Sequence, residues 1–183
     1  MKVRFAGLLG LVGCLALVLS SVQAQDVKSG PEKKIAGAFD VKAITGEVAG
    51  KTLCYVCKYN GEQRPGVVLI FSQKADENIA KMIKAVDAVQ KNNAKLGTVL
   101  VGVGGVAAAD LEKLQSTHKL TTPLTIAVDT DGPKAYKLNK DAVVTVLVYA
   151  KGGTIHRNFA FTSTKAAAEK ASEIATAAQD VLK

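Results

Sequence analysis

Hydrophobic side chains follow two different spacings along this chain. Two short, nearly unbroken apolar runs, 67–71 and 98–103, are typical of strands buried on both faces of a parallel sheet. Apolar residues then recur every three or four positions in 76–91, after the first run, and in 107–118, after the second. The pattern therefore predicts strand, helix, strand and helix in that order.

Flanking segments add further elements to these two units. Residues 39–44 alternate between apolar and polar side chains, and residues 124–128 form a short apolar run that ends at the turn of 129–133. Both segments are expected to be strands, and residues 133–138 to make one or two helical turns. The segment 50–61 has no pattern that predicts its local structure.

The last third of the chain changes character. Two β-rich runs, 143–149 and 154–161, are separated by Gly152-Gly153, which predicts a β-hairpin. An alanine-rich segment, 165–182, predicts one long closing helix. Parallel units followed by an antiparallel hairpin and a helix describe an α/β fold with a central mixed sheet and helices on both faces.

Three stretches carry a resemblance to a known family. They are the strand 67–71 before the long helix, the run 124–132 followed by Ala135-Tyr136, and the run 144–153. This order of elements resembles the thioredoxin-like fold, and within it the redoxin branch of thiol-disulfide oxidoreductases and peroxiredoxins. The resemblance implies one thioredoxin-like domain over residues 39–183.

The amino-terminal segment resembles an export signal. Lys2 and Arg4 precede a long apolar run, and small residues before Gln25 offer a cleavage site after Ala24. We expect a signal peptide over 1–24, a flexible lead-in over 25–38, and a periplasmic or extracellular product. A minor alternative is a lipoprotein anchored through Cys14. No later segment is apolar enough for a stable membrane span.

The net charge of +8 comes from 24 basic and 16 acidic residues. The lysines stand singly, without an arginine cluster or interleaved aromatic residues, so they indicate a solvated surface and no nucleic-acid partner.

The resemblance also implies that this chain lacks the reactive cysteine and the cis-proline of redoxins. In redoxins the reactive cysteine follows the strand matching 67–71, and this chain has Ser72-Gln73-Lys74-Ala75 there. The cis-proline that faces that cysteine in the family would fall near Val144, where a cis bond without proline is costly. Both halves of the usual site are therefore expected to be lost.

One cysteine pair, Cys54 and Cys57, is left after the expected cleavage. Its C-x-x-C spacing permits a disulfide if the backbone turns, whereas a regular strand would point the two side chains to opposite faces. A structural disulfide, an exchange-active dithiol, and free thiols or half of a metal site all fit the sequence. Lys51 and Lys58 would favour a thiolate nearby.

No cofactor or metal is expected. Lys58 follows Cys57, so the haem attachment motif is absent, and His118 and His156 fit surface positions better than a metal site. The run 102–107 matches G-x-G-x-x-A, but no acidic residue follows at the distance that a dinucleotide site requires.

Two hypotheses follow from these residues. In the first, Cys54 and Cys57 are the catalytic residues of an exported thiol-disulfide oxidoreductase, whose partners are exported protein thiols or disulfides. In the second, the chain is a non-catalytic thioredoxin-like module that binds an unknown protein partner, and the disulfide only stabilises it.

Overall fold

The computed structural model describes residues 27–183. The expected signal peptide (1–24) and the alternative lipidation site Cys14 lie outside the described residues. Within the described part, no helix is long and apolar enough to cross a membrane.

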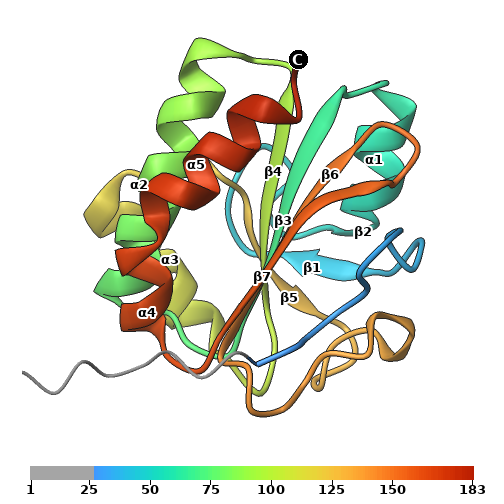
Figure 1. Ribbon diagram of the computed structural model, residues 1–183. Helices are drawn as coiled ribbons and strands as arrows, with labels where there is room; N and C mark the ends of the chain where they lie inside the picture. Colours follow the sequence, from blue (N-terminus) through green and yellow to red (C-terminus); the bar gives the residue numbers. More distant parts are fainter. Residues whose placement is uncertain (1–26) are drawn as a thin grey trace, which may run out of the picture.

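Seven strands form one mixed sheet in the order β2-β1-β5-β4-β3-β6-β7 (Figure 1). Strands β3, β4 and β5 are parallel to one another, while β6 runs antiparallel to β3 and pairs with β7 in a hairpin. The strand bounds are β1 Val41–Ala43, β2 Thr52–Leu53, β3 Gly66–Ser72, β4 Leu96–Gly102, β5 Leu124–Ala127, β6 Val144–Ala150 and β7 Ile155–Phe161.

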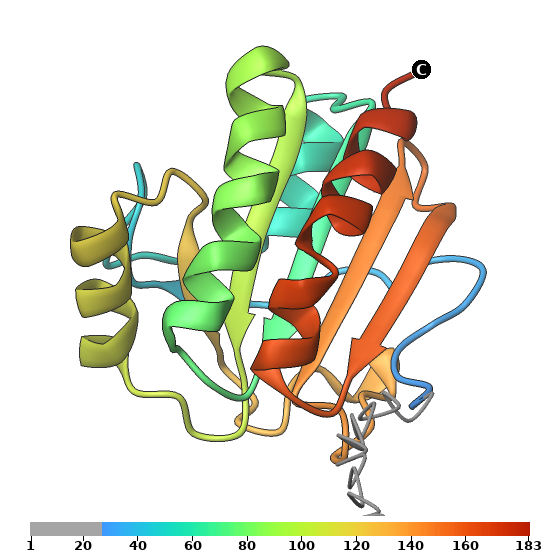
Figure 2. The ribbon, with the colours of Figure 1, turned by 60° about the vertical axis from the view of Figure 1, so that its left-hand side comes forward.

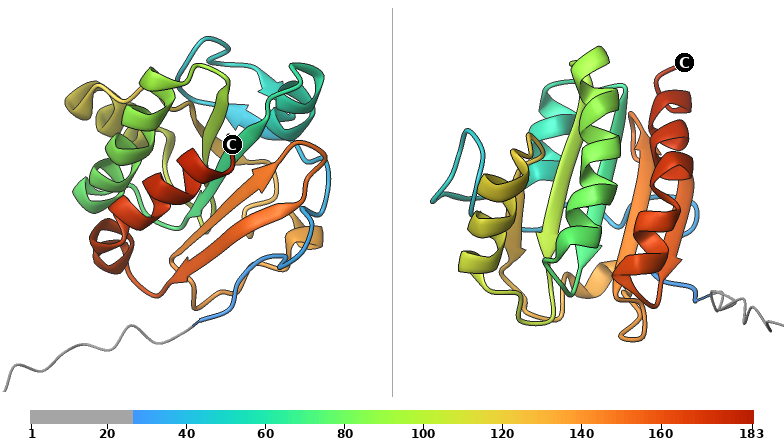
Figure 3. Two further views of the ribbon diagram at one scale, coloured as in Figure 1. Left: turned by 45° about the horizontal axis from the view of Figure 1, so that its top comes forward. Right: turned by 90° about the vertical axis from the view of Figure 1, so that its left-hand side faces the viewer.

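Helices cover both faces of this sheet. The helix bounds are α1 Tyr55–Gly61, α2 Glu77–Asn92, α3 Ala108–His118, the 3-10 turn η1 Lys134–Tyr136, α4 Thr164–Glu169 and α5 Ala171–Asp180. Helices α3, α2 and the α4–α5 pair lie side by side over one face (Figure 3, right). Helix α1 lies behind the sheet in the view that brings α2 forward (Figure 2).

The central strand β3 is buried at all seven positions because its alternate side chains enter two cores. Val68 and Ile70 pack with α2 and α5, whereas Leu69 and Phe71 pack on the face that carries α1. A strand in this position needs apolar residues on both faces, which explains its unbroken apolar run.

Most of the expected elements are confirmed. The buried strands, the two crossover helices and the closing hairpin all form, and the mixed α/β sheet has helices on both faces. The prediction of one long closing helix over 165–182 is wrong, because the backbone turns at Lys170, with ψ at 9° instead of a helical value, and divides α4 from α5.

The segment 27–38 belongs to the part expected to be a flexible lead-in, and it contacts both strands of the hairpin. Ser29 is buried, its hydroxyl lies 2.7 Å from that of Thr145, and Asn158 donates its side-chain amide to the Ser29 carbonyl. Farther along, the Ile35 N–H donates to the Gly153 carbonyl. These contacts fix the segment beside β7 and bring it toward α1.

Candidate functional site

The two cysteines are joined in a disulfide at the beginning of α1. Cys54 is the N-cap residue in an extended conformation, and the helical turn that follows brings the Cα atom of Cys57 to 5.2 Å. This separation lies inside the usual range for disulfides. Of the sequence alternatives, the helical turn and the bonded pair are therefore the ones observed.

The two sulfur atoms have different surroundings. Cys57 is exposed and Cys54 is half-buried. The Cys54 Sγ atom accepts a hydrogen bond from the Cys57 backbone N–H at 3.0 Å, the bond that an N-cap side chain normally accepts. Cys57 is therefore the more accessible of the two cysteines.

Two tyrosines on one side of α1 hold the helix against the sheet. Tyr55 and Tyr59, one turn apart, are both buried, and the Tyr59 hydroxyl donates a hydrogen bond to the Thr98 carbonyl at 2.5 Å. Burial raises the pKa of both phenols, so they stay neutral donors at physiological pH. A Cβ atom at Gly97 would lie 2.9 Å from the Tyr59 ring, so glycine makes room for it.

Charged residues close the carboxyl end of α1. Glu62 accepts hydrogen bonds from Lys58 and Arg64, and the Arg64 guanidinium lies over the Tyr59 ring at 5.2 Å. The hydrogen bond from Lys58 is the main reason that the pKa of Glu62 is lowered. Because Lys58 is paired with Glu62, its charge is not free to favour a thiolate at the cysteines, as the sequence had indicated.

Cys57 lies on the wall of a cavity of about 430 Å³ between α1, the segment 34–38 and the β6–β7 turn. We call this cavity the α1 groove. The turn between β6 and β7 lies beside α1 in two different views (Figures 1 and 3). The residues that line the α1 groove, besides Cys57, include Lys34, Ile35, Val56, Arg64, Tyr149 and Lys151.

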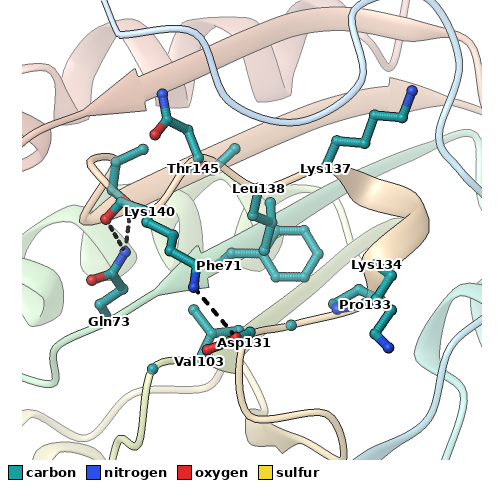
Figure 4. A pocket seen from close by; sticks show the side chains of 14 residues that line it. Phe71, Gln73, Val103, Asp131, Pro133, Lys134, Lys137, Leu138, Lys140 and Thr145 are labelled. Carbon is teal, nitrogen blue, oxygen red and sulfur yellow. Dashed lines mark hydrogen bonds and ion pairs between the residues drawn. The ribbon is translucent and has the colours of Figure 1, made fainter.

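A second cavity, of about 330 Å³, lies at the carboxyl end of β3 on the same face. Phe71 and Leu138 lie together in it, and Lys140 reaches toward Asp131 (Figure 4). Gln73 donates its side-chain amide to the carbonyls of Lys140 and Ala142, which holds the 129–143 loop in place.

Comparison with solved structures identifies the fold. Peroxidoxin BcpB from Mycobacterium tuberculosis matches with a TM-score of 0.56 at 16% identity, over 82% of this chain and 98% of that chain. A thioredoxin family thiol:disulfide interchange protein from Chlorobium tepidum matches with a TM-score of 0.53 at 14% identity, over 82% and 98%. This chain has a thioredoxin-like fold.

A third similar structure is a secreted disulfide oxidoreductase of Mycobacterium tuberculosis that is homologous to E. coli DsbE. It has a TM-score of 0.53 and 15% identity, over 76% of this chain and 95% of that chain. No protein-family model and no curated protein matches this thioredoxin-like chain by sequence.

The usual redoxin position has no thiol here. Ser72 ends β3, is fully buried, and donates its hydroxyl to the Lys74 carbonyl. At the start of α2, where the family places its thiolate, the Asp76 carboxylate accepts from the Ile79 N–H and from the Thr164 hydroxyl. A carboxylate therefore takes the anion-stabilising place at this helix end.

Val144 lies opposite Ser72 in the β3–β6 register, as the resemblance implied for the family's proline position. No peptide bond among residues 27–183 is cis. Neither feature of the usual redoxin site is present in this thioredoxin-like domain.

The cysteine pair is at the other end of the central strand from that usual position. The α1 groove includes Val67, near the start of β3, whereas the cavity of Figure 4 includes Phe71, near its end. Val67 and Ser72 are separated by about 17 Å of extended strand. The sequence shows that the cysteine pair precedes β3, but it does not show that the pair lies at the opposite end of this strand from the usual redoxin position.

The histidines do not join the cysteines. His118 is the last residue of α3, and His156 is exposed on the edge strand β7. Over residues 27–183, no three histidine, cysteine or acidic side chains lie close enough to hold a metal ion. In the G-x-G-x-x-A run, Gly104 and Gly105 both have positive φ, which the turn between β4 and α3 requires.

Sequence reasoning missed the residues that surround Cys57. Lys34, Ile35, Tyr149 and Lys151 come from the lead-in and from the hairpin, far from the cysteines in the chain. No local motif marks them, because the pairing of β6 with β3 and of the lead-in with the hairpin brings them to α1.

Proposed function

We propose that this protein catalyses thiol-disulfide exchange through Cys54 and Cys57, with Cys57 as the sulfur that partners attack. The observation that carries the proposal is the exposed residue Cys57 on the wall of the α1 groove, bonded to a half-buried Cys54 whose sulfur accepts a backbone hydrogen bond. A disulfide in this position is accessible to a second polypeptide.

The exchange proceeds in two steps. A substrate thiolate attacks Cys57 Sγ, the Cys54–Cys57 bond breaks, and Cys54 leaves as a thiolate that accepts the Cys57 N–H hydrogen bond. A second substrate thiolate then attacks the substrate sulfur of the mixed disulfide and expels Cys57 as a thiolate. The substrate dithiol loses two electrons and becomes a disulfide, and the protein pair gains them. The reverse sequence reduces a substrate disulfide.

A purely stabilising disulfide fits the surroundings less well. The bond closes a ring of only four residues, for which chain entropy contributes about 2 kcal/mol. Helix α1 has other anchors in Tyr55 and Tyr59, both buried against the sheet. The fold therefore depends little on this bond, which leaves it free to open and close.

Export is part of the same proposal. The expected signal peptide over residues 1–24 would deliver the protein to the periplasm or to the extracellular space, where disulfides persist. Exported proteins that carry thiols or disulfides are then the partners that Cys57 would meet.

The test is catalysed reduction of insulin by dithiothreitol with the purified chain from residue 25. The wild-type protein is expected to accelerate the reaction, and Cys54→Ser and Cys57→Ser are expected to lose the acceleration. Ser72→Ala, at the usual redoxin position, is the matched control and is expected to behave as the wild type. Serine variants of the cysteines that retain full activity would overturn the proposal.

A further inference from the structure

The α1 groove has an apolar interior next to Cys57. Ile35, Val56 and Tyr149 line it from three separate parts of the chain. Its volume of about 430 Å³ lies in the range of ordinary ligand pockets. An apolar side chain that enters the groove would bury its surface beside Cys57, which lines the same groove.

The wall opposite α1 is built from backbone that is already paired. The Ile35 N–H donates to the Gly153 carbonyl, and the Ile155 N–H donates to the Lys33 carbonyl. Gly153 has a φ of 86°, and a Cβ atom there would lie 2.8 Å from the Ile35 side chain. Glycine at this position therefore lets Ile35 form part of the groove.

The charge around the groove has one sign. Lys34, Arg64 and Lys151 line it, and no acidic residue does. Arg64 is paired with Glu62, but Lys34 and Lys151 are exposed and form no ion pair within the described part of the chain. Two positive charges without an ion-pair partner among the described residues therefore flank an apolar groove that Cys57 lines.

We propose that the α1 groove binds an acidic segment of a partner polypeptide that carries an apolar side chain beside its reacting cysteine. This inference rests on the exchange activity proposed for Cys57 and names its class of substrate. Acidic side chains complement Lys34 and Lys151, which speeds encounter, and the apolar side chain fills the groove, which holds the partner thiol beside Cys57.

Matched peptides test this selectivity. Each contains one cysteine between two leucines, flanked by aspartates in one peptide and by lysines in the other. Oxidised protein is mixed with each reduced peptide, and the rate at which the Cys54–Cys57 bond opens is measured by thiol labelling and mass spectrometry. Each rate is divided by the rate of the same peptide on neutral hydroxyethyl disulfide, which removes differences in intrinsic thiol reactivity.

The acidic peptide is expected to react about 10-fold faster than the basic one at low ionic strength. The ratio is expected to fall toward one in 1 M salt, where the Debye length is about 3 Å. The double variant Lys34→Glu and Lys151→Glu is expected to reverse the preference. The control Lys137→Glu and Lys140→Glu, with the same charge change at the other cavity, is expected to keep it.

Dithiothreitol, which is neutral and small, separates the two proposals. If dithiothreitol opens the bond readily but both peptides react equally, the groove proposal is wrong and the exchange activity stands. If neither dithiothreitol nor the peptides open the bond, both proposals are wrong. Circular dichroism of the variants checks that the exposed substitutions leave the fold intact.

Discussion

The Cys54 Sγ atom accepts a hydrogen bond from the backbone N–H of Cys57 and is also bonded to the Cys57 Sγ atom in the disulfide. The same turn of α1 therefore places Cys57 at the surface and supports a negative charge on Cys54 when the bond opens. The two cysteines are consequently not equivalent, although the sequence motif is nearly symmetric.

This asymmetry predicts different behaviour of the two serine variants. Cys54→Ser removes the residue that resolves a mixed disulfide, so the exposed Cys57 of this variant is expected to accumulate a mixed disulfide with a substrate disulfide such as glutathione disulfide. Cys57→Ser leaves only the half-buried Cys54, which is expected to react at least several-fold more slowly. Mass spectrometry of the trapped adducts measures both rates. Equal rates would contradict the assignment of Cys57 as the attacked sulfur.

The stability of the protein is expected to depend little on the disulfide. Replacing both cysteines by serine is expected to lower the free energy of unfolding by about 2 kcal/mol, or the melting temperature by about 4–8 °C. Thermal unfolding followed by circular dichroism measures the change. A fall several times larger would favour the alternative in which the pair only stabilises a binding module.

The hydrogen bond from Tyr59 to the Thr98 carbonyl predicts a defined loss in Tyr59→Phe. The variant keeps the buried ring against Gly97 but loses the hydroxyl, so its free energy of unfolding is expected to fall by about 1 kcal/mol. Urea unfolding measures the change. Tyr149→Phe is the matched control, since the Tyr149 hydroxyl makes no hydrogen bond to the described residues, and it is expected to change stability less.

The lowered pKa of Glu62 predicts that this residue stabilises the protein to an extent that depends on pH. Its pKa is lowered from the ordinary value of 4.5, first by the hydrogen bond from Lys58, so its contribution is present above pH 4.5 and is lost as the pH falls through the lowered value. Because the side chain is one-third exposed, the contribution at pH 7 is expected to stay below about 1 kcal/mol.

The matching experiment compares wild type and Glu62→Gln by urea unfolding between pH 2 and pH 7. The difference in stability is expected to be largest at neutral pH and to disappear at the acidic end. Glu169→Gln, whose ion pair with Lys165 is 4.0 Å long and well exposed, is the control with little expected effect at any pH. A difference for Glu62→Gln that grows with acidity would contradict the assigned role.

Asp87 anchors the loop before β5 from inside the fold. Its carboxylate is buried and accepts from the backbone N–H groups of Thr121 and Thr122 and from the Thr122 hydroxyl. Asp87→Ala leaves the two backbone N–H groups without this acceptor and is expected to cost about 3 kcal/mol in urea unfolding. Asp87→Asn keeps one acceptor oxygen and is expected to cost less.

The sequence predicted the framework because burial repeats locally. The unbroken runs of β3 and β4 and the helical spacing of α2 each reflect neighbours that bury the same positions throughout the element. The turn at Lys170 was missed because alanine favours a helix on both sides of it, and the bend depends on how α4 and α5 pack against α2.

The site was harder to predict from the sequence than the framework, because it depends on contacts between segments that are far apart in the chain. The C-x-x-C spacing marked Cys54 and Cys57, but α1 is a short helix whose formation depends on Tyr55 and Tyr59 finding the sheet. Tertiary packing, rather than local propensity, decides such a segment. The groove beside Cys57 likewise exists only after the lead-in has paired with β7.

The most direct test of the account is a redox titration of Cys54 and Cys57 in glutathione buffers, read by thiol labelling. The pair is expected to pass reversibly between disulfide and dithiol with a potential between about −270 and −120 mV, the range of known exchange proteins. A pair that stays oxidised in the most reducing glutathione buffer would contradict the claim that Cys57 takes part in exchange.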